Sequence, residues 1–201
     1  MSILKIARMG HPVLRAKARA LHPSEIRTPK IQQLIDDMFE TMKEYQGIGL
    51  AAPQVHEGVR LFVAGFPPAL RGEDDEYESE EEGPDEENED EDDREDVPVM
   101  ALINPEIVPA GRETVEDWEG CLSITDIRGR VPRARRISVR AYDRAGKKIE
   151  FDASGFTARV IQHETDHLDG VLFLDRMKGL QSLTFLDEFG RYWSGPSSRA
   201  D

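Results

Sequence analysis

The sequence predicts an α+β fold, in which antiparallel or mixed strands pack around a central helix and a further helix lies near the C-terminus. Three observations carry this prediction. Apolar residues recur at helical spacing between Ile31 and Met42 and again between Phe156 and Leu168, and residues 137–142 alternate apolar and polar side chains. A chain of 201 residues with these patterns suits one domain, so we expect residues 1–201 to form a single unit.

The first predicted helix begins after Thr28, which can cap it, with Pro29 in its first turn and Gly47 near its end. Its apolar residues fall on one face and are Ile31, Leu34, Ile35, Met38, Phe39 and Met42. Two strand-like runs follow, at residues 59–66 and 97–108. The segment between these runs has a different composition.

Residues 73–96 form an acidic insertion with 18 acidic side chains and one basic one, Arg94. This segment carries a charge of −17, so the rest of the chain carries +3 against the total of −14. Because it has almost no apolar residues to bury, we expect a disordered or loosely helical loop within the domain. It is either a solvated loop without a partner or a docking surface for a basic partner.

The C-terminal half reads as a hairpin followed by helices. The strand at 137–142 leads into a turn at 143–146, and residues 148–151 begin the return strand. The second helix has its apolar face at Phe156, Val160, Ile161 and Leu168, with Gly170 placed to end it. The spacing of apolar residues suggests a final helical piece whose aromatic side chains we expect to pack in the core against the body; these apolar residues are Leu180, Leu183, Phe185, Leu186, Phe189 and Trp193.

Cysteine content and hydropathy indicate the compartment. The single cysteine, Cys121, excludes an internal disulfide and points to a reducing compartment or a functional thiol. Residues 1–10 lack the apolar run of a signal peptide, and no stretch approaches the roughly 20 apolar residues of a membrane span. We therefore expect a cytoplasmic protein without membrane contact.

The motif that most clearly indicates a metal-binding, catalytic site is His163-Glu164-Thr165-Asp166-His167, inside the second predicted helix. Residues four apart on a helix share one face, so the two imidazoles can bind one metal ion. Glu164 can then reach a water on that ion without being a ligand, as in zinc-type hydrolases. The alternative is two histidines satisfied by hydrogen bonds on a helix face.

A catalytic site of this kind takes three protein ligands and leaves one position for water. One protease class would place a histidine at position 173, where this chain has Phe173. Another would use a downstream acid, Asp187 or Glu188. The remaining candidate is Cys121, whose thiolate binds borderline metals well, although a lone cysteine is more often a small buried hydrophobe. Gly120 beside it suggests a bend or a close backbone approach.

A third stretch, Gly47-Ile48-Gly49-Leu50-Ala51-Ala52-Pro53-Gln54-Val55, has little side-chain bulk. Backbone groups there can touch a ligand directly, and Gln54 offers an amide donor. It is not a phosphate loop, because no Gly-Lys-Ser/Thr follows. Taken alone, the stretch is a tight structural turn.

Together these stretches match one family. Residues 47–54, 119–123 and 162–168 resemble, in order, the three motifs of peptide deformylases. The opening run at 6–15 is also similar to that family's first strand and turn, and the resemblance covers residues 3–177 apart from the acidic insertion. It implies a bacterial-type enzyme that removes the formyl group from the N-terminal formylmethionine of newly made proteins and releases formate.

The resemblance also implies a ligand set and a base. Cys121, His163 and His167 would hold one divalent metal with water as the fourth ligand, and Glu164 would move the proton. The metal is usually ferrous iron in the cell, with nickel, cobalt or zinc as substitutes, and a thiolate beside iron predicts oxygen sensitivity.

The family's pattern places the other roles as well. The backbone N–H of Leu122 and the amide of Gln54 would stabilise the oxyanion, and the backbone at Ile48 and Gly49 would pair with the peptide. The remaining implied substrate contacts are Gly120, Arg128, Phe156 and Val160, the last two lining a methionine pocket with the His163 ring. Arg128 has a structural alternative, bracing its loop through a carboxylate.

Some features fall outside this pattern. The family commonly has proline after Gly-Cys-Leu-Ser-Ile, whereas this chain has Thr125-Asp126, which can alter the mouth of the site. His11, His22 and His56 match no ligand position, and we expect them at the surface or in packing. Substrates of this family emerge at the ribosome, so we expect transient ribosome association without direct reading of nucleic acid, and the acidic insertion can contact basic ribosomal proteins or shield the site.

Three alternatives remain. The first is a zinc endopeptidase with Glu188 as its third ligand. The second is a binding protein built around the acidic segment with a purely structural metal, which would need a fourth protein ligand. The third is a related enzyme acting on another small formyl or acyl substrate.

Overall fold

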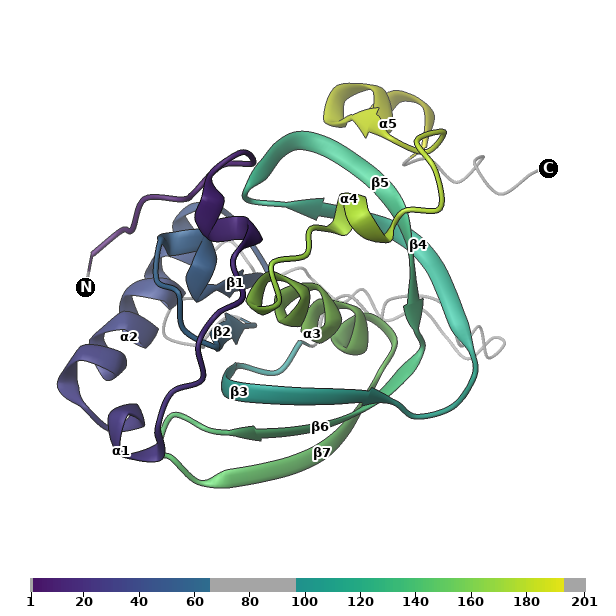
Figure 1. Cartoon of the computed structure of the whole chain (residues 1–201). Coiled ribbons are helices and arrows are strands. Elements are labelled where there is room, and N and C mark those ends of the chain that lie inside the picture. Colours follow the sequence, from purple (N-terminus) through teal and green to yellow (C-terminus); the bar gives the residue numbers. More distant parts are fainter. Residues whose placement is uncertain (1, 66–96, 194–201) are drawn as a thin grey trace, which may run out of the picture.

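The computed structural model describes residues 2–65 and 97–193, which form two antiparallel sheets around one central helix (Figure 1). The helices are α1 (Pro23–Ile26), α2 (Pro29–Glu44), α3 (Gly155–Leu168), α4 (Phe173–Arg176) and α5 (Leu186–Tyr192). The strands are β1 (Gly49–Ala51), β2 (Leu61–Ala64), β3 (Met100–Pro109), β4 (Thr114–Cys121), β5 (Ile124–Ala134), β6 (Arg136–Tyr142), β7 (Lys148–Ser154) and β8 (Thr184–Phe185). Two 3-10 turns are η1 (Pro12–Arg15) and η2 (Ala52–Val55).

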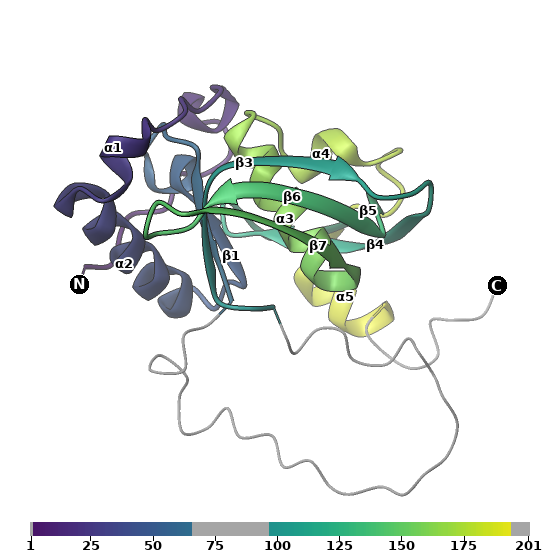
Figure 2. The ribbon, with the colours of Figure 1, turned by 90° about the horizontal axis from the view of Figure 1, so that it is seen from below.

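The two sheets differ in size and enclose α3 from different sides. The larger has the strand order β1-β2-β3-β6-β7, and the smaller has the order β4-β5-β8. Helix α3 contacts β1, β2, β6 and β7 of the first sheet and β5 of the second. Figure 2 shows β6 and β7 crossing in front of α3 when the molecule is seen from below. The predicted α+β fold with a central helix is therefore confirmed.

Helix α2 packs its apolar face on the strands that lead into the site. Its buried residues include Ile35, Met38 and Met42, each with no exposed surface, and they share a core cluster with Leu50 and Leu61. At 25 cal/mol per Å², each such side chain contributes roughly 1.5–3 kcal/mol when fully buried. This cluster fixes β1, which forms one wall of the site.

The ends of α2 differ from the expected caps. Thr28 occupies the N-cap position, but its hydroxyl donates backward to the Glu25 carbonyl and makes no cap hydrogen bond. At the other end Gln46, with φ of 52°, takes the left-handed conformation that reverses the chain after the helix. Gly47 has another role: a Cβ there would lie 2.7 Å from Leu122 Cδ1, so it permits close approach to the site loop.

The hairpin of β6 and β7 follows the predicted alternation. Ile137, Val139 and Ala141 are buried on one face while Arg136 and Arg140 are exposed on the other. Residues 143–146 form the expected turn, in which the Asp143 carbonyl accepts the N–H of Gly146. The buried face of this hairpin supports α3 from below.

The C-terminal helix is shorter and more exposed than the sequence suggested. Residues 180–193 contain β8 and then α5, and no residue of α5 is buried. The aromatics do contact the body, because the rings of Phe189 and Trp193 lie 5.0 Å and 5.6 Å from the Trp118 ring of β4. They lie at the surface, however, with Phe185 and Trp193 63% and 45% exposed, so the expectation that they are part of the core was wrong. Helix α5 lies over β5 and β8 (Figure 1).

The acidic insertion at 73–96 lies outside the described residues. Across the two described ranges, no helix has both the length and the apolar character that crossing a membrane requires.

Candidate functional site

Helix α3 carries two histidines on one face and is buried on most sides. His163 and His167 are one turn apart, and their ring centroids are 5.0 Å from each other. The helix starts at Gly155, whose φ is 56°, and the chain leaves it through Gly170, whose φ is 74°. Burying an unpaired polar group costs free energy. Polar side chains on so enclosed a helix are therefore expected to have partners or a functional role.

Cys121 approaches this face from the end of β4. Its Sγ lies 3.3 Å from His167 Nε2, and the ligand atoms of Cys121, His163 and His167 all lie within 4.8 Å of one another. Among the described residues this is the one group of three or more histidine, cysteine or acidic side chains so arranged. Glu188, the third ligand of the endopeptidase alternative, instead pairs with Arg191 on α5.

The electrostatics of the three groups suit a divalent cation. Burial raises the pKa of the Cys121 thiol, but the charges and hydrogen bonds of His167 and His163 outweigh it and hold that pKa well below its usual range. The thiolate is the form that binds metal, and a cation can replace the proton shared among these groups. One sulfur and two imidazole nitrogens form the three-ligand set of an open, catalytic site. The residues present therefore fit a bound metal.

Glu119 fixes the orientation of His163. Its Oε2 accepts a hydrogen bond from His163 Nδ1 at 2.9 Å, while Arg133 donates to Oε1 from Nε at 2.8 Å and to Oε2 from Nη2 at 2.9 Å. Burial raises the pKa of Glu119, but the hydrogen bonds and charges of Arg133 and His163 bring it far below the usual range. A carboxylate only accepts, so Nδ1 carries the hydrogen and Nε2 is left for the cluster.

Glu164 lies beside the cluster in a buried position. It is 4% exposed, and its Oε2 has no hydrogen-bond partner within the described part of the chain. Burial, helped by the negative charges of Cys121 and Glu119, outweighs the lowering by His163 and His167 and raises the pKa of Glu164 to about 7. A carboxyl group with this pKa can both accept and donate a proton near neutral pH.

The wall opposite α3 comes from β1 and η2. Gly49 in β1 faces Glu164 so closely that a Cβ would lie 2.8 Å from Glu164 Cδ. Gln54 is 1% exposed; its Oε1 accepts the N–H of Ala51 at 2.8 Å, and its Nε2 donates to Ser123 Oγ at 3.2 Å and lies 3.5 Å from the Cys121 sulfur. The bond to Ala51 fixes which end of the amide faces the site, so Gln54 presents a donor there.

The loop after Cys121 forms the mouth. Strands β4 and β5 lose their regular register between Glu119 and Cys121, and Asp126 in the β5 side of this irregularity has a φ of 65°. Leu122 lies in the two-residue turn between the strands. Thr125 accepts a hydrogen bond from Arg8, which ties the mouth to the N-terminal segment.

These elements surround one cavity of about 490 Å³. The sequence-predicted site residues that line it are Ile48, Gly49, Gln54, Gly120, Cys121, Leu122, Arg128, Phe156, Val160, His163 and Glu164. His167 completes the ligand cluster behind them. Val160 is also a core residue with 4% exposure, and the Arg128 guanidinium lies 4.9 Å from the Phe189 ring centroid. All the predicted residues are thus brought together.

Several cavity-lining residues had no predicted role. They are Tyr45, Gln46, Trp118, Glu119, Ile124, Ile127, Arg159 and Leu186. The sequence offered a signal for Arg159, which precedes His163 by one helical turn and therefore shares its face. It offered none for Leu186, which reaches the cavity because β8 pairs with Ile127 and Arg128 of β5. His11, His22 and His56 lie elsewhere: the first two cap η1 and α1, and His56 stacks edge-on against His11.

Comparisons with known proteins agree on one family. The family model of polypeptide deformylases matches residues 3–182. "Peptide deformylase 1" of Bordetella pertussis is 41% identical over 182 residues, which are 90% of this chain and 92% of that protein. A crystal structure of peptide deformylase from Thermotoga maritima superposes with a TM-score of 0.70 and 33% identity, covering 89% of this chain and all of that one. A class I type b peptide deformylase from Acinetobacter baumannii, bound to Met-Ala-Ser, has a TM-score of 0.70 and 33% identity, covering 88% of this chain and all of that one.

Proposed function

This chain belongs to the polypeptide deformylase family, and from that membership we propose how its own residues divide the reaction. The enzyme is a hydrolase that removes the N-formyl group from nascent polypeptides. The observation that supports the division of roles is the convergence of Cys121, His163 and His167 beside the buried carboxyl of Glu164.

Cys121 Sγ and a ring nitrogen of each of His163 and His167 would hold one divalent metal ion. Such an ion supplies Lewis acidity, which polarises the formyl carbonyl and makes water a stronger nucleophile at neutral pH. A sulfur with two imidazoles accepts iron, nickel, cobalt or zinc, and we propose ferrous iron as the ion used in the cell, by resemblance to the family.

Glu164 is the proposed proton carrier. It accepts a proton from the water that attacks the formyl carbon and returns it to the amine nitrogen as the C–N bond breaks, so that formate and a free N-terminal amine leave. Its burial, its unpartnered Oε2 and its pKa of about 7 support this role.

The negative charge that develops on the formyl oxygen needs donors already in place. Gln54 Nε2 is anchored by the bond that Ala51 makes to its Oε1, so the donor does not have to reorganise during the reaction. The backbone N–H of Leu122, in the turn after Cys121, is the second proposed donor.

The peptide is proposed to lie along β1, pairing with the backbone of Ile48 and Gly49, with Gly120 on the other side. The methionine side chain would enter the apolar part of the cavity between Phe156, Val160 and the His163 ring. The Acinetobacter relative has been solved with Met-Ala-Ser bound, which supports a short peptide beginning with methionine as a ligand of this chain. Arg128 also lines the cavity, and its guanidinium lies over Phe189, which supports both substrate contact and bracing.

The substrate also suggests a partner. Formylmethionyl chains emerge at the ribosome, so we propose a transient encounter with it, which cosedimentation of the protein with translating ribosomes would test. Unchanged cosedimentation after deletion of residues 73–96 would remove any contribution of the acidic insertion to that encounter.

The function is tested by formate release from a formyl-Met-Ala-Ser peptide with the iron- or nickel-loaded protein. Glu164→Gln, prepared and loaded identically, is expected to lose at least about 100-fold in kcat while retaining its metal, because it cannot carry the proton. Cys121→Ser is expected to lose the metal itself. A Glu164→Gln variant with wild-type kcat would contradict the assigned role, and a folded, metal-loaded wild type that releases no formate would contradict the substrate.

A further inference from the structure

Arg159 is a buried cation that none of the proposed reaction roles uses. It lies on α3 one turn before His163 and is only 6% exposed. Placing a guanidinium inside a domain is costly unless its donors are satisfied. The partners that satisfy them show what this side chain holds in place.

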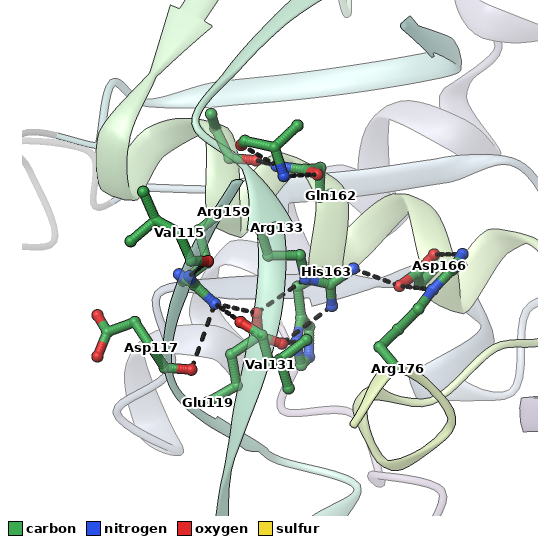
Figure 3. Close-up of polar contacts among 12 residues, drawn as sticks. Val115, Asp117, Glu119, Val131, Arg133, Arg159, Gln162, His163, Asp166 and Arg176 are labelled. Carbon is green, nitrogen blue, oxygen red and sulfur yellow. Dashed lines mark hydrogen bonds and ion pairs between the residues drawn. The ribbon is translucent and has the colours of Figure 1, made fainter. Parts of the chain in front are cut away.

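The guanidinium joins β4 and β5 of the smaller sheet to α3 (Figure 3). Nη1 donates to the carbonyl of Val131 on β5 at 2.9 Å and lies 3.4 Å from that of Asp117 on β4. Nη2 donates to the carbonyl of Val115 on β4 at 2.7 Å. One side chain therefore contacts the backbone of β4 and β5 from the helix that carries both histidine ligands.

The same guanidinium also holds the carboxylate that orients a ligand. Nη1 donates to Glu119 Oε1 at 2.8 Å, while Glu119 Oε2 accepts from His163 Nδ1 at 2.9 Å. Figure 3 shows Arg159 and Arg133 on Glu119 together, with Arg133 continuing to Asp166 at 2.5 Å. Arg133 alone reaches both oxygens of Glu119, so Arg159 is not needed to give the carboxylate a cationic partner.

What Arg159 adds is a fixed distance between two parts of the metal site. The thiolate ligand Cys121 lies at the end of β4, and the imidazole ligands lie on α3, more than 40 residues later in the chain. Their separation is set by how the smaller sheet packs on the helix. Arg133 and Gln162 also join β5 to α3, but Arg159 is the side chain of Figure 3 that bonds from α3 to the backbone of β4. We propose that Arg159 is a positioning residue that locks β4 and β5 to α3 through Glu119 and three backbone carbonyls, and so sets the Cys121-to-His163 spacing and the ring orientation of His163.

This inference rests on the proposed metal site and extends it to a residue outside the ligand set. Lysine cannot replace arginine here, because a single ammonium cannot span a carboxylate and carbonyls on two strands at once. Partners of metal ligands typically change metal affinity by roughly 10- to 100-fold when they are removed.

The test compares Arg159→Met and Arg159→Lys with a matched control, Arg60→Met. Arg60 is also a largely buried arginine that ties α3 to a strand, since it donates to the Leu168 carbonyl, to Asp169 at 2.6 Å and to the Pro105 carbonyl. Within the described part of the chain, Arg60 makes no hydrogen bond to Glu119 or to a metal ligand. If α3 only needs anchoring, Arg159→Met and Arg60→Met therefore lose cobalt affinity alike. If Arg159 positions the ligands, only the two Arg159 variants lose it.

Two measurements distinguish positioning of the metal ligands from anchoring of α3 alone. Cobalt affinity, measured by competition with a chromophoric chelator, is expected to fall roughly 10- to 100-fold in Arg159→Met and by less than about 2-fold in Arg60→Met. Ring nitrogen NMR of the zinc-loaded protein is expected to report hydrogen on Nδ1 of His163 in the wild type and a weakened or exchanging signal in Arg159→Met. Arg159→Lys keeps a cation beside Glu119 and is expected to fold. Its cobalt affinity is nevertheless expected to be several-fold lower than that of the wild type.

Each outcome decides the matter. Reduced cobalt affinity in the Arg159 variants alone supports the proposal, and Arg159→Lys gives the answer if Arg159→Met does not fold. Wild-type affinity and an unchanged His163 signal in either folded Arg159 variant would overturn it, as would an equal loss in Arg60→Met. A wild-type protein that binds no cobalt would instead contradict the proposed metal site itself.

Discussion

The contact between Gly49 and Glu164 leads to a sharp prediction about catalysis. Replacing Gly49 by alanine would place a Cβ 2.8 Å from Glu164 Cδ, whereas ordinary van der Waals contact begins near 3.4 Å. The Glu164 Cδ or the strand must therefore move by at least about 0.6 Å, and Oε1, which lies nearer still, by more. The strand is held by antiparallel pairing of Gly49 with Ala64, so the Glu164 carboxyl group is the part that moves, within the cavity that it lines.

The expected loss in rate follows from that displacement. A misplacement of about 1 Å in an active site can cost about 100-fold in rate, so a 0.6 Å shift of Glu164 is expected to lower kcat by about 10- to 100-fold. This corresponds to roughly 1.4–2.7 kcal/mol in activation free energy. Overpacking is also expected to lower the free energy of unfolding by about 1–3 kcal/mol.

The assay is formate release by metal-loaded Gly49→Ala, with metal content and the free energy of unfolding in urea measured on the same preparation. Gly58→Ala is the matched control, because a Cβ at Gly58 meets nothing within 4 Å. The control is expected to keep wild-type kcat. A Gly49→Ala variant that also keeps it, with full metal content, would refute the argument that Glu164 needs this space.

Two further outcomes are expected. Gln54→Ala removes a pre-oriented donor and is expected to lower kcat about 100-fold with the metal retained; an effect on KM alone would exclude an oxyanion role. The hydrogen bond from Arg19 and that from the His22 N–H lower the pKa of Glu25 from 4.5 to about 2, so its stabilising contribution is complete above pH 4.5 and is lost as pH falls toward 2. NMR titration of the Glu25 carboxyl should show a midpoint near pH 2, and Arg19→Gln should raise that midpoint. A wild-type midpoint near pH 4.5 would contradict the pairing of Glu25 with Arg19.

The buried polar network around α3 reflects function more than stability. Buried ion pairs often stabilise a fold less than apolar residues of the same volume would. Glu119, Arg133, Arg159 and Asp166 nevertheless lie at 5–7% exposure around the helix that bears the histidines. Their common effect is to hold the orientation of that helix and of His163, which apolar packing without direction would not achieve.

The sequence by itself determined the parts of the site that depend on local geometry. The spacing of His163 and His167 places both rings on one face of any helix, and the apolar periodicity around them indicates that helix. The alternation at 137–142 and the turn after it predicted the β6–β7 hairpin in the same way. These patterns depend only on the period of the backbone, so no tertiary information was needed.

The tertiary structure decided whatever depends on contacts between distant segments. That Cys121 meets His167 and that Arg159 reaches β4 and β5 follow from how the smaller sheet packs on α3, and that Gly49 leaves room for Glu164 follows from how β1 of the larger sheet packs on the same helix. The exposure of α5 was likewise missed, because apolar periodicity shows that a face exists and cannot show what covers it. Periodicity is a property of a few consecutive residues, whereas these contacts join segments whose separation only the folded chain fixes.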